Sequence, residues 1–172
     1  MIFTRTNALK GEITVPGDKS ISHRSIMFGA LAEGTTRVTN FLRGADCLST
    51  IDCFRKLGID IEDLDSEILI HGKGLHGLTA PSSMLEVGNS GNTPRLNTGI
   101  LAGQRFTTKL NGDESIQSRP MKRIMEPLTL MGADITIISE KGCAPLRIHG
   151  QKLHGIADTS KDDSAPVNSC IL

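Results

Sequence analysis

The stretch Pro16–Arg24 contains the side chains best suited to binding an anion. Lys19 supplies an ammonium group, Ser20 a hydroxyl group and Arg24 a guanidinium group, and Arg24 follows Ser20 by about one helical turn. A single phosphate or carboxylate can accept hydrogen bonds from all three groups. A lone Lys or Arg is usually an ordinary surface residue, but this concentration of anion-binding groups favours a binding site over capping and surface roles.

The flanking sequence predicts the elements that position these groups. Gly11–Val15 alternates enough for a short strand, and Ser25–Glu33 has helical spacing with Gly34 as its stop. Ser20 is expected to cap this helix, with Lys19 just outside it. Because the first N–H groups of a helix have partial positive charge, the strand-to-helix turn is itself a predicted anion site.

Composition argues against several classes of protein. The 172 residues include 19 Lys and Arg, 19 Asp and Glu, five Phe and no Trp or Tyr, a balance that disfavours nucleic-acid binding. No run is apolar and long enough for a membrane span, and the first residues lack a signal core, so a cytoplasmic protein is expected. The cysteines lack metal-ligand spacing and are expected to be free, mostly buried thiols: Cys47, Cys53, Cys143 and Cys170.

The chain repeats one pattern of strand, helix, strand, helix, strand, strand. The first unit spans about residues 11–77 and the second about 85–155, with extra residues in the second around Ser115–Pro120. Matching positions include Gly17 with Gly88, Arg24 with Arg95, Gly44 with Gly112, and Gly58 with Gly132. A third unit begins in residues 156–172, and the chain stops within its first helix, as expected of a fragment.

The second unit has its own anion-binding features. The strand Leu85–Val87 is followed by Gly88–Arg95, in which Thr93 and Pro94 suit the cap and the first position of a helix. Arg119 precedes a further helix, expected over Pro120–Met131. Two helix N-termini, each followed one turn later by an Arg, suit two anions held near each other.

Other polar groups have simpler interpretations. Adjacent Asp113 and Glu114 favour a solvated turn over an acid–base pair, and no third group is evident that would orient His23 as a base for Ser20. Four histidines fall in the duplicated Gly-rich hairpins, which favours turn and surface roles over metal binding: His71, His76, His149 and His154.

The run Pro16-Gly17-Asp18-Lys19-Ser20-Ile21-Ser22-His23-Arg24 closely resembles the signature of the 5-enolpyruvylshikimate-3-phosphate synthase family. The spacing of its glycines and lysine does not fit a Walker P-loop. The resemblance implies an α+β fold of repeated βαβαββ units, the inside-out α/β barrel of the enolpyruvyl transferases. The chain would be an incomplete N-terminal domain of a two-domain enzyme.

The resemblance also implies an activity. The enolpyruvyl (carboxyvinyl) group of phosphoenolpyruvate would be transferred to the 5-hydroxyl of shikimate 3-phosphate, with release of phosphate, in chorismate and aromatic amino acid biosynthesis. It implies no metal or organic cofactor and a monomeric full-length enzyme. Its proton-transfer residues belong to the second domain, so no catalytic residue is assigned here. The chain alone is expected to bind shikimate 3-phosphate weakly, to show no turnover, and to fray beyond about Gly155.

The same resemblance implies two sets of binding residues. The shikimate 3-phosphate set is Lys19, Ser20, Arg24, Ser164 and Ala165, and the phosphoenolpyruvate set is Lys19, Asn89, Gly91 and Arg119. Three positions depart from the family pattern: Asn92, where Thr is usual, Asn97, where the helix is usually apolar, and Pro166, where a substrate-contacting Gln is usual.

Three alternatives remain open. An enolpyruvyl transferase acting on a UDP-sugar shares the fold and the donor but lacks the Asp18–Arg24 pattern. A non-catalytic anion-binding module would use the helix ends for binding only. An RNA-end-processing enzyme with related repeats is disfavoured by the zero net charge and the scarcity of aromatic residues.

Overall fold

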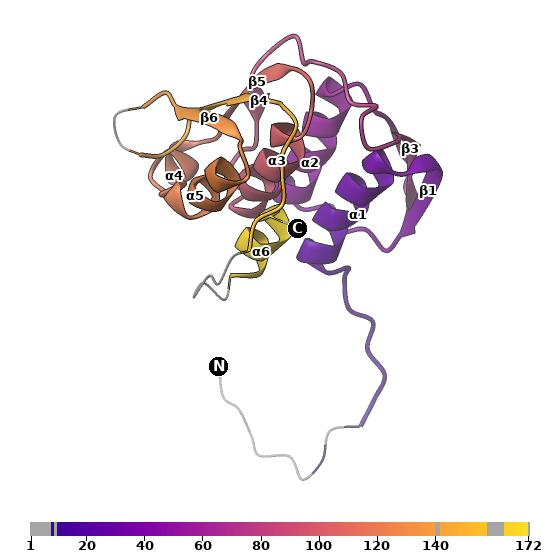
Figure 1. Ribbon diagram of the computed structural model, residues 1–172. Helices are drawn as coiled ribbons and strands as arrows, with labels where there is room; N and C mark the ends of the chain where they lie inside the picture. The colour runs from indigo at the N-terminus through magenta and orange to yellow at the C-terminus, as the bar shows by residue number, and fades with distance from the viewer. Residues whose placement is uncertain (1–7, 9, 140–141, 158–163, 172) are drawn as a thin grey trace.

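A computed structural model describes residues 8, 10–139, 142–157 and 164–171, and Figure 1 shows the arrangement of the helices and strands in this part of the chain. In chain order they are α1 Lys19–Leu31, β1 Glu33–Thr39, α2 Ala45–Lys56, β2 Asp60–Asp63, β3 Glu67–Lys73, β4 Leu85–Glu86, α3 Asn92–Ala102, β5 Thr107–Asn111, α4 Glu114–Gln117, α5 Lys122–Leu130, β6 Asp134–Ile137, β7 Leu146–His149 and α6 Ala165–Ile171. No helix among the described residues is long and apolar enough to cross a bilayer.

The strands form two sheets with related pairing. One has the order β1-β3-β2 and the other the order β4-β5-β7-β6. β1 and β3 are antiparallel with Thr35 opposite His71, and β5 and β7 are antiparallel with Thr107 opposite His149. In each pair the Thr hydroxyl lies within hydrogen-bonding distance of the His Nδ1 atom, at 3.0 and 2.7 Å. His71 and His149 thus have equivalent cross-strand roles in the two sheets.

Glycine ends the second helix of each unit in the same way. Gly58 and Gly132 have φ values of +88° and +94°, a left-handed conformation that costs glycine little. Ile59 N donates to Phe54 O at 3.0 Å, closing the end of α2. Ala133 N makes the corresponding bond to a carbonyl of α5 at 2.8 Å. The predicted helix stops at these two glycines are confirmed.

The core lies between helices and sheets. α1, α2 and α3 pack side by side, with the β1-β3-β2 sheet covering α1 and the β7 strand covering α3 (Figure 1). The sheet residues facing these helices are fully buried, among them Ile68, Ile70, Leu146 and Ile148. Gly72 lets β3 approach the end of α1 closely, because a Cβ there would lie under 3.0 Å from helix carbonyl oxygens.

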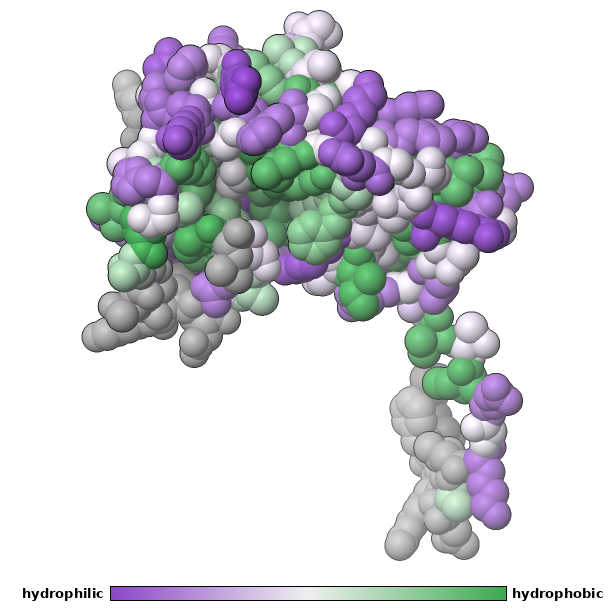
Figure 2. All heavy atoms as spheres, turned by 45° about the vertical axis from the view of Figure 1, so that its right-hand side comes forward, coloured by the Kyte–Doolittle hydropathy of each residue, from purple (hydrophilic) through white to green (hydrophobic). Residues whose placement is uncertain are grey.

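The predicted strand at Gly11–Val15 is wrong for this structure. Residues 10–18 leave the body as an extended segment with no strand pairing, and Ile13 and Val15 are 84% and 62% exposed (Figures 1 and 2). Alternation favours a strand only where a neighbouring edge accepts its hydrogen bonds, and this segment pairs with none of the described strands.

Beyond Gly155, where fraying is expected, the structure describes a packed helix. α6 packs on α3 and α5, and its Val167 and Cys170 side chains are 2% and 6% exposed. Gly99 on α3 makes room for it, since a Cβ at Gly99 would lie under 3.0 Å from Cys170 O. Residues 158–163, within the expected third unit, lie outside the described residues.

Candidate functional site

The N-terminus of α1 is capped by Asp18, not by Ser20 as predicted. The Asp18 carboxylate accepts a hydrogen bond from Ile21 N at 2.7 Å, and Asp18 has extended backbone angles. Lys19 is therefore the first residue of the helix, and Ser20 lies within its first turn. Because Asp18 caps the helix from the position before Lys19, the Ser20 side chain is not needed as the cap.

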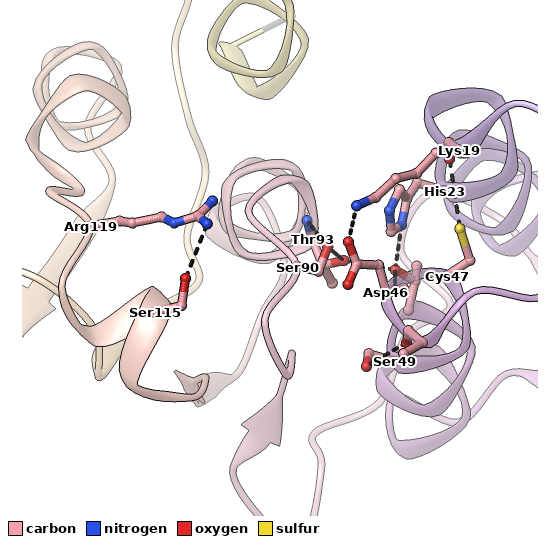
Figure 3. A network of polar contacts seen from close by, with 11 residues as sticks. Lys19, His23, Asp46, Cys47, Ser49, Ser90, Thr93, Ser115 and Arg119 are labelled. Atoms are coloured by element: carbon pink, nitrogen blue, oxygen red, sulfur yellow. Dashed lines mark hydrogen bonds and ion pairs between the residues drawn. The ribbon is translucent and has the colours of Figure 1, made fainter. Parts of the chain in front are cut away.

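Lys19 is oriented by an acidic partner that the motif does not point to. Its ammonium group forms an ion pair with the Asp46 carboxylate, from the first turn of α2 (Figure 3). The Asp46 side chain is 16% exposed, whereas that of Lys19 is 48% exposed. Asp46 of α2 thus holds the side chain of Lys19, which lies on the neighbouring helix α1. In the sequence, Asp46 stands out only as an acidic residue in the first turn of the helix that follows Gly44, a position where a negative charge is stabilising.

Arg24 links α1 to α6. Its Nη2 atom donates to Ser169 Oγ at 2.8 Å, and its Nη1 atom lies 3.4 Å from Ser20 O. Ser164 and Ala165 lie at the N-terminal end of α6, about one turn before Ser169, and Ser164 O accepts the first hydrogen bonds of that helix. The structure therefore brings the predicted residues of the first and third units onto two helices joined by Arg24.

Gly91 and Arg119, two residues of the predicted phosphoenolpyruvate set, lie side by side. A Cβ built on Gly91 would lie under 3.0 Å from Arg119 Nη1, so only glycine leaves room for the guanidinium group where it stands. Arg119 Nη2 donates to Ser115 Oγ of α4 at 3.1 Å. Asn89 is exposed in the same turn as Gly91.

The predicted helix start at Pro120 is corrected. α5 begins at Lys122, and the additional residues of the second unit form the short helix α4, which Asp113 caps by accepting from Ile116 N at 3.2 Å. Arg119 therefore lies in the connection between α4 and α5, not at the first turn of a helix. In the view of Figure 3, Arg119 and Lys19 reach toward Ser90 and Thr93 from opposite sides.

A buried polar network passes beneath this site. His23 Nδ1 lies 2.8 Å from Thr50 Oγ1, which lies 2.9 Å from Thr93 Oγ1. The Thr93 hydroxyl donates to Ser90 Oγ at 2.6 Å, and Thr93 N donates to the same oxygen at 3.2 Å. The cap residue of α3 is Gly91, not Thr93 as predicted, and Ser90 Oγ accepts from the Thr93 N–H in the first turn. His23 bonds inward to Thr50 instead of pairing with Ser20.

Burial sets the protonation of this network and of the thiols. Desolvation, assisted by the nearby charges of Lys19 and Arg24, lowers the pKa of His23 to about 4, so its ring is neutral at pH 7. Burial raises the pKa values of Cys53 and Cys170 to about 12. All four cysteines are free and buried, as predicted.

Of the three departures from the family pattern, Asn97 has the clearest structural consequence. Its side chain is fully buried in α3, and neither amide atom has a hydrogen-bond partner among the described residues. Asn92 is the first residue of α3, and Pro166 lies in the first turn of α6. An unpartnered buried amide is costly, so Asn97 is a local weakness of the core.

The chain is similar in sequence to one family of known proteins. The family model described as EPSP synthase (3-phosphoshikimate 1-carboxyvinyltransferase) matches residues 3–172. The 3-phosphoshikimate 1-carboxyvinyltransferase of Bacillus subtilis (strain 168) is 56% identical over 168 residues, covering 98% of this chain and 39% of the relative. That of Alkaliphilus metalliredigens (strain QYMF) is 55% identical over 172 residues, covering 100% of this chain and 40% of the relative.

A solved structure agrees with these relatives. EPSP synthase from Acinetobacter baumannii matches 94% of this chain and 37% of its own, with a TM-score of 0.90 and 54% sequence identity. The predicted α+β fold class is confirmed by this likeness. The chain spans about two fifths of the length of the relatives that it matches.

Proposed function

The chain belongs to the EPSP synthase family, and on that premise we propose that it provides one part of a 3-phosphoshikimate 1-carboxyvinyltransferase. The substrates are phosphoenolpyruvate and shikimate 3-phosphate. The 5-hydroxyl of shikimate 3-phosphate adds to carbon 2 of phosphoenolpyruvate, and loss of phosphate from the tetrahedral intermediate leaves the enol ether. The relatives named above support this reaction, and no general acid or base is assigned to the chain.

One observation supports the proposal most strongly. The Arg119 guanidinium group lies against Gly91, just before the N-terminus of α3, while Asp46 holds Lys19 on the other side of the same turn (Figure 3). Two cations and a helix N-terminus facing one turn suit the phosphate and carboxylate of phosphoenolpyruvate. Asn89 completes this set. Fixed cations of this kind stabilise the charge of the intermediate and hold the reactants in place.

Shikimate 3-phosphate is proposed to bind beside it. Lys19 and Ser20 in the first turn of α1, together with Arg24, would hold its phosphate group. Ser164 and Ala165 would contact it from the start of α6, which the Arg24–Ser169 bond ties to α1. Lys19 belongs to both substrate sets because it stands between the two turns.

We also propose that the chain consists of two complete units and the start of a third, all in one N-terminal domain. The units are residues 11–77, 85–155 and 156–172. The equivalent Thr–His bonds and glycine stops support the first two. An apolar groove of about 640 Å³ runs between α1, α3, α5 and α6, and its lining includes Phe28, Leu31, Ile100 and Met131. Such a groove suits the packing of further helices; hydrophobic side chains gather in the hollow at the middle of Figure 2.

Location and partners follow from the proposed reaction. We expect a cytoplasmic enzyme whose only required partners are its two small substrates, and a monomeric full-length protein. Among the alternatives, the UDP-sugar enzyme is disfavoured by the names of the relatives, all 3-phosphoshikimate 1-carboxyvinyltransferases. The non-catalytic binding module differs from the proposal only in turnover, and the two are separated by experiment.

Titration of the 172-residue chain tests the substrate set. Shikimate 3-phosphate should shift the amide NMR signals at the starts of α1 and α6 with weak affinity, and no phosphate should be released when phosphoenolpyruvate is added. Arg24→Gln should abolish these shifts, whereas Arg37→Gln, which removes an exposed Arg paired with Glu67 on the outer sheet, should not. Preferential binding of a UDP-sugar, or shifts confined to other surfaces, would contradict the proposal.

A further inference from the structure

The hydrogen-bonded chain from His23 to Ser90 has no part in the substrate contacts described above, yet it runs through the middle of the site (Figure 3). Its members, His23, Thr50, Thr93 and Ser90, are all fully buried and come from α1, α2, α3 and the turn before α3. We propose that they form a positioning network that fixes the turn Gly88–Asn92 relative to α1. The inference rests on the proposed function, because it concerns how the phosphoenolpyruvate turn is held.

The direction of the hydrogen bonds can be worked out from the unpaired atom. His23 Nε2 is buried and has no partner among the described residues. A buried N–H without an acceptor is rarer than a buried acceptor without a donor, so the proton belongs on Nδ1. His23 Nδ1–H then donates to Thr50, Thr50 donates to Thr93, and Thr93 donates to Ser90. The Thr50 hydroxyl also lies 3.4 Å from Asp46 O, but Thr93 Oγ1, at 2.9 Å, is the nearer acceptor and continues the chain toward Ser90.

The last hydrogen bonds of the network, between Thr93 and Ser90, fix the backbone conformation of the turn. Ser90 Oγ accepts from both the hydroxyl and the backbone N–H of Thr93, so two bonds lock the Ser90–Thr93 segment at the start of α3. Gly91, the residue that faces the Arg119 guanidinium group, lies inside this locked segment. A shift of Ser90 would therefore move the backbone that phosphoenolpyruvate is proposed to contact.

Helix α2 contacts both Lys19 and the turn before α3. Asp46, in its first turn, orients Lys19, and Thr50, one turn later, connects to the turn before α3. Both residues are held on one rigid helix, so the separation between Lys19 and the Ser90–Gly91 turn is set by α2. Apolar contacts alone leave neighbouring helices more freedom to slide than directional hydrogen bonds do.

Kinetics in an active enzyme can separate positioning from a merely structural role. We define the joined enzyme as this chain fused to the remaining part of the Bacillus subtilis relative that it does not cover. Thr50→Val keeps the side-chain shape and removes the hydroxyl link. It should raise the KM for phosphoenolpyruvate about tenfold, the equivalent of about 1.4 kcal/mol, while the KM for shikimate 3-phosphate changes less than about twofold. Thr50→Ser retains the hydroxyl and should restore the original KM.

Thr98→Val is the matched control. Thr98, on α3, is fully buried like Thr50, but its hydroxyl donates to Pro94 O of its own helix at 2.6 Å and to no other described residue. Its loss should leave both KM values unchanged even if it lowers stability. Equal changes for both substrates in Thr50→Val, or the same change in Thr98→Val, would overturn the positioning network.

A measurement on the unsubstituted 172-residue chain tests the network without an activity assay. Nitrogen NMR of His23 should show a neutral ring protonated at Nδ1, with a proton that exchanges slowly with water; protonation at Nε2 would overturn the network as drawn.

Different outcomes would contradict the proposed function and the positioning network. An inactive but folded joined enzyme would overturn the proposed function, whereas an active one in which Thr50→Val leaves the KM for phosphoenolpyruvate unchanged would overturn only the network.

Discussion

His23 is a titratable residue that the fold buries near the charges of Lys19 and Arg24. Its pKa of about 4 lies below the ordinary value of 6.5, with desolvation as the main cause and Lys19 and Arg24 as the lesser ones. The folded state therefore resists protonation that the unfolded chain accepts. The network that uses this ring needs it neutral, so the burial of His23 and the hydrogen-bond order are consistent with each other.

The first residue-scale prediction concerns pH. Between pH 6.5 and about 4 the unfolded chain binds more protons at His23 than the folded chain does, so stability falls as pH falls through this window. From pH 7 to pH 5 the free energy of unfolding should decrease by roughly 2 kcal/mol through this group. Urea unfolding at both pH values should show a smaller decrease for His23→Gln. Parallel decreases in the two proteins would contradict the assignment.

The second residue-scale prediction concerns the buried side chain of Asn97. Asn97→Leu replaces two unpartnered polar atoms with methyl groups of similar shape, so the free energy of unfolding should rise by about 1–3 kcal/mol. Thr98→Val, beside it on the same helix, removes a hydroxyl that does have a partner and should not stabilise the protein. Thermal and urea unfolding of both variants provide the test. A less stable Asn97→Leu protein would mean that the amide has partners that this structure does not describe.

Sequence reasoning located the cations better than the groups that orient them. Lys19, Arg24 and Arg119 stand within recognisable motifs, and Arg119 lies against Gly91 of its own predicted set. Asp46 and Thr50 lie far from these motifs in the chain and meet them only through the packing of α1, α2 and α3. No local pattern encodes such pairings, because they depend on tertiary contacts.

At the scale of elements, helix ends were predictable where glycine ends the helix. Gly58 and Gly132 follow α2 and α5 with positive φ, as their position after apolar periodic runs indicates. Helix starts were less predictable, because several residues near one start can serve as the cap: Asp18 caps α1, and Gly91 is the cap residue of α3. The predicted strand at Gly11–Val15 failed because alternation does not reveal whether an edge is available.

The element-scale prediction tests the docking of α6. Gly99→Ala would place a methyl group under 3.0 Å from Cys170 O, a backbone atom that can move only with α6. The variant should lose about 1–3 kcal/mol of stability and should expose α6 amides to hydrogen exchange. Gly103→Ala is the control, since its Cβ would have no neighbour nearer than 3.8 Å. Unchanged protection of α6 in Gly99→Ala would contradict the close approach of the two helices.

At the scale of the whole molecule, the internal repeat accounts for most of the predictable architecture. Matching glycines indicated two similar units, and the two sheets have equivalent Thr–His bonds. The insertion predicted around Ser115–Pro120 corresponds to α4. What the repeat did not predict is that α6 packs firmly against α3, burying Val167 and Cys170. A short segment gains its order from the units that it contacts, which its own sequence does not encode.

The most direct test of the account is phosphate release by the joined enzyme. We predict release that requires both phosphoenolpyruvate and shikimate 3-phosphate, that falls at least about a hundredfold in Arg119→Gln, and that is retained in Arg37→Gln. A folded joined enzyme that binds shikimate 3-phosphate but releases no phosphate would contradict the central claim, and it would make this chain an anion-binding module without a role in carboxyvinyl transfer.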